Sequence, residues 1–379
     1  MWRRLEQRAD WQIAFAITAA LRAVYTGVAA VAAVSLHPDA RLIQSNGELA
    51  KNLPVPHGLH YALLGVWQRF DTLWYLRIAE HGYDLPAGVV FYPLYPWLIR
   101  GLSGLAGPMA AALLISTVAA FFYFWGLLRL TRREFPDAQP LRTMLLAAAW
   151  PASFFFFAGY TEALAVALIV WCVSWAREER WVLAAVCAFA AGLTRSAGTL
   201  AIVPLAILAW RAPRPARWPV AIAPLGTLGY WFWLHRTGRL SVAAAYRTYW
   251  NTEVASPWTT LWRAIRSLAE RPNALVAISL VALIFFFVTG VAARRRKRMP
   301  IRIEDRCFSA AVIVHLLLRL CWPPLLGTPR YLLAVYPAYV TMGNWVENMG
   351  WTRFAFLCGA LFAFNLAWMW AFLSWSLVL

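Results

Sequence analysis

The chain has 379 residues, of which 61% are hydrophobic and 14% charged, and its formal net charge is +18. A soluble domain is about half apolar and a quarter charged, so this composition argues against one. The cations lie between apolar stretches and leave no soluble basic domain, so we expect no nucleic-acid partner. The sequence predicts an all-α polytopic membrane protein whose partner is the lipid bilayer.

Apolar segments follow one another along the whole chain, which we treat as a single membrane domain, 1–379. A spanning helix needs roughly 20 apolar residues, and about eleven segments approach that length. Tilting, re-entrant pairs or broken helices would each account for the shorter ones. The first segment is too long for a cleaved signal peptide and is interpreted as a retained helix. The expected spans are 11–35, 108–129, 142–158, 162–176, 181–194, 197–210, 218–234, 273–293, 307–321, 331–346 and 353–376.

Arginines gather in alternate loops between these spans. If the N-terminus is inside, the inside loops hold most of them, with the largest cluster at 294–298. The short outside loops hold little beyond Arg195 and Arg330. Because cytoplasmic loops are enriched in Lys and Arg, we expect a multi-pass cell-membrane protein with a cytoplasmic N-terminus. The preference for arginine over lysine favours a bacterial source.

Two long segments then lie outside the cytoplasm, at 36–107 and 235–272. In the first, the apolar spacing over 59–81 predicts one or two interfacial helices that stop at Gly82. The aromatic and proline stretch at 91–96 is not expected to form regular helix. In the second, arginines outnumber acids, which indicates amphipathic helices with snorkelling arginines or a site for an anionic headgroup.

Asp71 is the strongest candidate for catalysis. It lies among apolar and aromatic residues where an interfacial helix would meet the outer surface. Such a carboxylate is suited to act as a general base. The structural alternative is a helix cap or a simple ion pair with Arg69 or Arg77.

Other ionisable residues lie at outer turns or within spans, where they are costly and are either paired or functional. Glu162 and Arg195 form one plausible pair, with a structural or a substrate role equally open. His315 and Arg319 are one helical turn apart and could face a shared cavity, although a buried polar contact is the favoured account. His57 and His60 alone are weak support for a metal site.

Motifs in chain order resemble the GPI mannosyltransferase 2 family, within the GT-C class of membrane glycosyltransferases, in a bacterial form. The stretches that carry the likeness are Phe70-Asp71-Thr72 with Gly82-Tyr83, 91–96, Pro151-Ala152-Ser153 with Tyr160-Thr161-Glu162, Thr194-Arg195-Ser196, and Pro329-Arg330-Tyr331. The resemblance implies transfer of mannose from a polyprenyl-phosphate donor to a glycolipid, glycan or protein acceptor outside the cytoplasm, with inversion.

By this resemblance Asp71 would be the base that deprotonates the acceptor. Fixed cations would stabilise the departing lipid phosphate, and the candidates are Arg330, Arg195 and the arginines near Arg247. The other expected substrate contacts are Glu162, His81, Tyr83, Tyr92 and Tyr331. We expect no resident metal or cofactor, with a divalent ion left open. The alternative function is a transporter or flippase of a lipid-linked anion.

Overall fold

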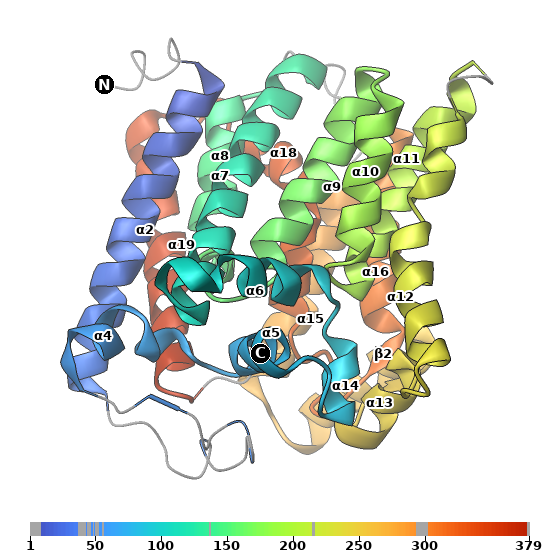
Figure 1. The fold of residues 1–379 in the computed structure, drawn as a ribbon. Coiled ribbons are helices and arrows are strands. Elements are labelled where there is room, and N and C mark those ends of the chain that lie inside the picture. The colour runs from blue at the N-terminus through green and yellow to red at the C-terminus, as the bar shows by residue number, and fades with distance from the viewer. Residues whose placement is uncertain are drawn as a thin grey trace.

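The computed structural model describes residues 9–36, 43, 47, 49, 53–54, 57–135, 138–213, 217–292 and 302–376. The predicted arginine cluster at 294–298 lies outside the described residues. Within them the chain is almost entirely helical (Figure 1).

Each predicted span contains a helix. They are α2 (Asp10–Ser35), α7 (Pro108–Glu134), α8 (Pro140–Ala149), α9 (Glu162–Arg177), α10 (Trp181–Gly192), α11 (Ile202–Arg211), α12 (Leu225–Arg236), α15 (Ala274–Phe287), α16 (Ile303–Leu317), α18 (Tyr336–Trp345) and α19 (Trp351–Leu373). Within the described residues, four are long and apolar enough to cross a membrane: α2, α7, α19, and α15 with its π-helical extension to Ala292. The other seven have 10–16 residues. The expected number of crossings therefore stays a prediction.

The two long loops carry helices of their own. The first holds α4 (Gly58–Leu63), α5 (Asp71–His81) and α6 (Leu94–Ala106), and the second holds α13 (Val242–Tyr249) and α14 (Pro257–Glu270). As predicted, α5 stops at Gly82, which has a φ of 71° that suits glycine. The expectation for 91–96 was partly wrong, because α6 begins at Leu94. Pro96 lies in its first turn, where a missing N–H costs little.

Shorter segments complete the chain. The 3-10 turns are Gly65–Trp67, Pro86–Val90, Ser153–Phe156, Ser196–Ala201, Trp218–Ile222 and Leu332–Ala334, and α17 is the single turn Thr328–Tyr331. In the described part of the chain one sheet occurs, an antiparallel pair of two-residue strands. It joins β1 (Glu253–Val254) to β2 (Arg319–Leu320) and ties the second loop to the end of α16.

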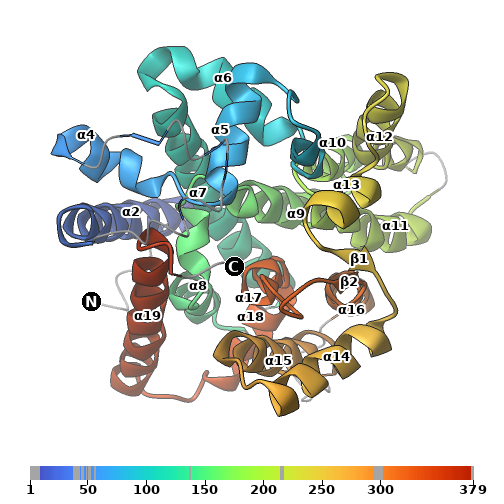
Figure 2. The same cartoon turned by 90° about the horizontal axis from the view of Figure 1, so that it is seen from below.

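The bundle has two distinct ends. The C-terminal ends of α7, α9 and α11 lie at the end of the bundle where α2 begins (Figure 1). The helices α5, α13 and α14 and the short sheet lie at the other end, where Figure 2 shows them around α17. The arginine-rich turns and the loop helices are thus on opposite sides, as the charge pattern predicts.

The centre of the bundle is α7. In its most apolar stretch 67% of residues are buried inside the protein, against 22% for α2 and 28% for α19. Helices α2 and α19 therefore leave most of their apolar surface facing outward, as expected of helices in contact with lipid.

A buried ion cluster closes the arginine-rich end. Arg177, at the end of α9, lies 2.7 Å from Asp305 and 3.4 Å from Glu304, both in α16. It is also 3.5 Å from Glu134 at the end of α7. Because each of these side chains is almost fully buried, the cluster fixes α7, α9 and α16 together at the end remote from the loop helices.

Small residues set the contact between α10 and α12. A Cβ added at Gly226 would overlap the backbone carbonyl of Phe189, whereas one added at Gly229, a turn later in α12, would meet nothing within 4 Å. We predict that Gly226→Ala separates the two helices and costs about 1–3 kcal/mol. Gly229→Ala should be neutral or slightly stabilising. Thermal unfolding of both variants in detergent measures the difference, and equal midpoints would contradict the packing described here.

Candidate functional site

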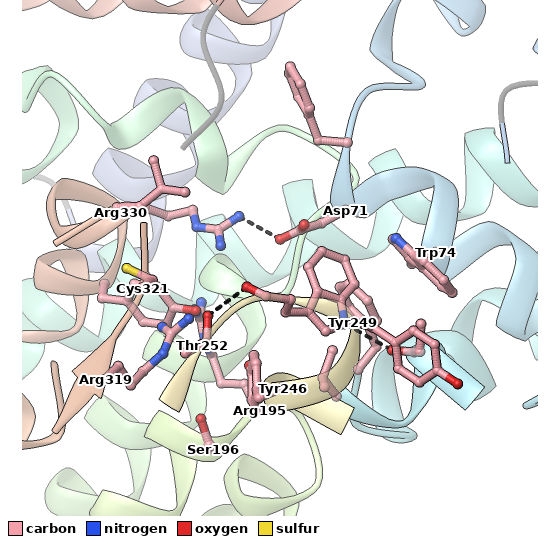
Figure 3. A pocket seen from close by; sticks show the side chains of 18 of the residues that line it. Asp71, Trp74, Arg195, Ser196, Tyr246, Tyr249, Thr252, Arg319, Cys321 and Arg330 are labelled. Atoms are coloured by element: carbon pink, nitrogen blue, oxygen red, sulfur yellow. Dashed lines mark hydrogen bonds and ion pairs between the residues drawn. The ribbon is translucent and has the colours of Figure 1, made fainter. Parts of the chain in front are cut away.

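A cavity of about 440 Å³ opens among the loop helices, at the end of the bundle opposite the arginine-rich turns. Its walls come from α5, the N-terminus of α9, the turn after α10, α13, β2 and α17. Figure 3 shows acidic, basic and aromatic side chains converging on it. Segments that are far apart in the sequence therefore build one polar chamber.

Asp71 is the first residue of α5, and its carboxylate points into this cavity (Figure 3). The preceding Phe70 has a φ of 47°, which is strained for an aromatic residue. Its ring packs 4.9 Å from Trp375, and the Asp71 backbone N–H donates to the Tyr160 hydroxyl at 3.3 Å. Strained backbone of this kind is characteristic of functional sites, and here it directs the carboxylate inward.

Asp71 does not form the ion pair with Arg69 or Arg77 that was the structural alternative to a catalytic role. Arg69 donates instead to the Leu373 carbonyl and the Tyr61 hydroxyl. Arg77 forms its ion pair with Asp84 at 2.7 Å and holds the pKa of that carboxyl below its usual range. The partner of Asp71 is Arg330, at 2.6 Å between Oδ2 and Nη1.

Glu162 joins this pair to a second arginine. Its Oε1 lies 2.6 Å from Arg195 and 3.2 Å from Arg330, and its side chain is 2% exposed. The predicted pair of Glu162 with Arg195 therefore forms. The position of Glu162 at the first residue of α9 adds the favourable field of a helix N-terminus.

Tyr331 lies at the centre of the arginines. The guanidinium carbons of Arg195, Arg319 and Arg330 are 4.4, 4.6 and 5.3 Å from the centre of its ring. Cation–π contacts of this length hold guanidinium groups in place while leaving N–H donors for a ligand. An aromatic ring thus keeps three like charges at one site.

Arg319 was not among the predicted substrate contacts. It lines the cavity from β2, opposite Val254 of β1, so the second loop fixes its backbone. The one signal in the sequence that pointed to Arg319 was its position one helical turn after His315. In the structure His315 hydrogen-bonds Ser196 at 3.2 Å. That contact agrees with the favoured account of a buried polar interaction, and His315 and Arg319 also line a second cavity together, as the other account expected.

The remaining predicted contacts are dispersed. His81 ends α5 with its side chain half exposed, and the buried Tyr83 donates to the Phe91 carbonyl at 2.6 Å. Arg247 is exposed on α13. None of these three lines the cavity, and Tyr92 lines a neighbouring one.

In the described residues no group of three or more His, Cys, Asp and Glu side chains is placed so that it could hold a metal ion. The two carboxylates of the cavity, Asp71 and Glu162, are both paired with arginine.

Comparison with known proteins gives a partial likeness. No family model matches the chain. Over 154 residues it is 31% identical to the human protein named GPI alpha-1,6-mannosyltransferase 2. The match covers 37% of this chain and 31% of the human protein, so the chain spans about a third of the relative it matches. The likeness is distant, and it agrees with the resemblance read from the motifs.

We predict that Glu162→Gln destabilises the protein more than any exposed acid does. The change leaves two buried arginines without their shared carboxylate, which costs about 3 kcal/mol. Glu80→Gln is the control, because the Glu80 side chain is 49% exposed. Thermal unfolding in detergent should show a clearly lower midpoint for Glu162→Gln alone, and two equal midpoints would show that the bridge is not structural.

Proposed function

We propose that the protein is a membrane glycosyltransferase. It transfers a mannosyl or related hexosyl group from a polyprenyl-phosphate donor to an acceptor outside the cytoplasm. The observation that carries this proposal is the inward-facing carboxylate of Asp71, set beside buried arginines in one cavity. The distant likeness to a mannosyltransferase supports the class of reaction.

The reaction needs a base and an anion site, and the cavity offers both. Asp71 would accept the proton of the acceptor hydroxyl. The acceptor oxygen would then bond to the anomeric carbon as the bond from that carbon to the phosphate oxygen breaks. The electron pair leaves with the polyprenyl phosphate, and attack from the opposite face inverts the anomeric centre. Arginines near the departing phosphate would stabilise its growing charge.

Arg330 would have two functions in this scheme. Its ion pair with Asp71 holds the carboxylate in a fixed position at the wall of the cavity. Its place beside Arg195 also puts it among the cations available to the phosphate. Because Arg330 already has two carboxylate partners, it is a shared cation and not a free one.

A lipid-linked donor agrees with where the cavity lies. The described helices long enough to span a membrane extend between the arginine-rich end of the bundle and the end that carries the cavity (Figure 1). The arginine-rich turns are at the other end, and the positive-inside bias would put them in the cytoplasm. We therefore propose an extracytoplasmic site, in a cell membrane, with the N-terminus inside.

Replacing Asp71 by Asn should reduce sugar transfer by about 100- to 10,000-fold, because the amide cannot accept the proton. The assay uses purified full-length protein with a panel of polyprenyl-phosphate sugars and native lipid extract. Asp84→Asn is the control, since Asp84 pairs with Arg77 and does not line the cavity. Undiminished transfer by Asp71→Asn would refute the base assignment. Movement of the intact lipid-linked sugar across the bilayer, without transfer, would favour the transporter alternative.

Replacing Arg330 by Ala should weaken donor use more than acceptor use. A lost charge-assisted hydrogen bond to phosphate raises the donor KM by about tenfold or more. Arg247→Ala is the matched control, because Arg247 is exposed and outside the cavity. Donor and acceptor are titrated separately, and equal donor saturation in wild type and Arg330→Ala would contradict a phosphate role.

A further inference from the structure

A second cavity of about 590 Å³ adjoins the candidate site. Ser196, Tyr246 and Arg319 line both cavities, so the two meet at these side chains. The second cavity is formed by α12, α13, β1 and the end of α16, and we call it the α12–α16 groove. Polar chamber and groove are therefore neighbouring compartments with these side chains in common.

The α12–α16 groove is mainly apolar, unlike the chamber beside it. No acidic side chain is among its lining residues in the described chain, and its hydrophobic walls include Trp231, Leu234, Val242, Val254 and Leu318. Its basic members, apart from Arg319, are His235 and Arg239, which are both exposed, and the half-buried His315. An apolar space with a cation at its inner end matches a molecule with an anionic head and a hydrocarbon tail.

Arg319, at the junction, has no acidic partner. In the part of the chain that the structure describes it forms no ion pair with a carboxylate, unlike Arg195 and Arg330. Its Nε is buried and lacks a hydrogen-bond partner. The guanidinium instead packs 5.3 Å from the ring of Tyr246 and 4.6 Å from that of Tyr331. A guanidinium buried without an acid is costly unless a ligand supplies the anion.

Two phenols lie against Arg319. Burial raises the pKa of the Tyr246 hydroxyl, so this phenol stays neutral. Burial of Tyr331 is outweighed by Arg319, Arg330 and Arg195, which lower the pKa of its hydroxyl to about 8, so at pH 7 this phenol is mainly protonated and supplies little negative charge. Among the lining residues of the chamber, the three arginines 195, 319 and 330 face two carboxylates, Asp71 and Glu162, which leaves one positive charge uncompensated. A phosphodiester carries one negative charge, so it would neutralise the site, whereas a diphosphate would overfill it.

We propose that the α12–α16 groove holds the first isoprenoid units of a prenyl phosphodiester and that Arg319 binds its phosphate. The proposal deepens the proposed function, on which it rests for the nature of the donor. Figure 3 shows Arg319 and Trp74 on opposite sides of the chamber. The donor thus enters past α13 with its sugar toward Asp71, and the acceptor takes the space beside Trp74.

Binding of a tritiated farnesyl methyl phosphodiester, which carries one negative charge like the proposed donor, to the purified full-length protein in detergent tests this assignment without any transfer step. Arg319→Gln should lower the affinity by about tenfold or more, as expected for a lost hydrogen bond between charged groups. Arg247→Gln, on the neighbouring exposed face, should leave it unchanged. Asp71→Asn should bind as tightly as wild type or more tightly, because it removes a negative charge from the chamber.

The groove is tested separately from the charge. Ala243→Trp, which fills the groove from α13, should also lower the affinity for the farnesyl phosphodiester, whereas Thr248→Trp on the same helix should not. Farnesol and inorganic phosphate should each compete poorly, because each carries half of the recognised chemistry. Arg319→Lys keeps the charge and should retain part of the affinity. If Arg319→Gln fails to fold, the affinity of Arg319→Lys tests the phosphate role of Arg319 in its place.

Unchanged affinity in Arg319→Gln, or in Ala243→Trp, would overturn the assignment. Displacement by inorganic phosphate alone would also overturn it, since that result indicates a site for free phosphate. The predicted binding pattern in a protein that transfers no sugar would leave the inference standing and refute the transferase. Sugar transfer by the wild type, with no effect of Arg319→Gln on binding, would support the transferase function and refute the binding role of Arg319.

Discussion

The shared carboxylate of Glu162 is the interaction on which the site depends. It lies against Arg195 and Arg330, and Arg330 in turn reaches Asp71. These residues come from α9, the turn after α10, α17 and α5, which are far apart in the sequence. Because buried charges need partners, the chamber assembles only when all four segments are in place.

A consequence of this chain of charges is that the arginines are not equivalent. Arg195 and Arg330 are held by acids, so they position Glu162 and Asp71 as well as any ligand. Arg319 is held by aromatic rings and by strand pairing with the second loop. A reaction that expels a phosphate needs both kinds of group, one that orients the base and one that receives the anion.

The fold was largely predictable because hydropathy marks a membrane helix directly. Each expected span contains a helix, since apolar length alone dictates its position. Helix α6 was missed because the prolines ahead of it indicate a break, and sequence alone does not show that Pro96 lies in a first turn. The crossing number was not predictable in the same way, because seven of the helices are shorter than a bilayer requires.

The site was predictable where residues combined charge with an outer turn. Asp71, Glu162, Arg195 and Arg330 met that condition, and the structure brings all four together. His81, Tyr83 and Arg247 were chosen for chemistry and proximity in the chain, which do not fix the direction of a side chain. Arg319 was not predicted as a site residue because it lies at the end of an apolar span. Only the pairing of β2 with β1 shows which cavity it faces.

The most direct test of the account is the side of the membrane on which the chamber opens. His81 ends α5 with its side chain 53% exposed, and Arg180 is 59% exposed at the arginine-rich end. Each is replaced by Cys in a background free of native cysteines, and intact cells are treated with a membrane-impermeant maleimide. The account predicts labelling of His81→Cys in intact cells and of Arg180→Cys only after the membrane is opened. The reverse pattern would place Asp71 in the cytosol and contradict an extracytoplasmic transferase.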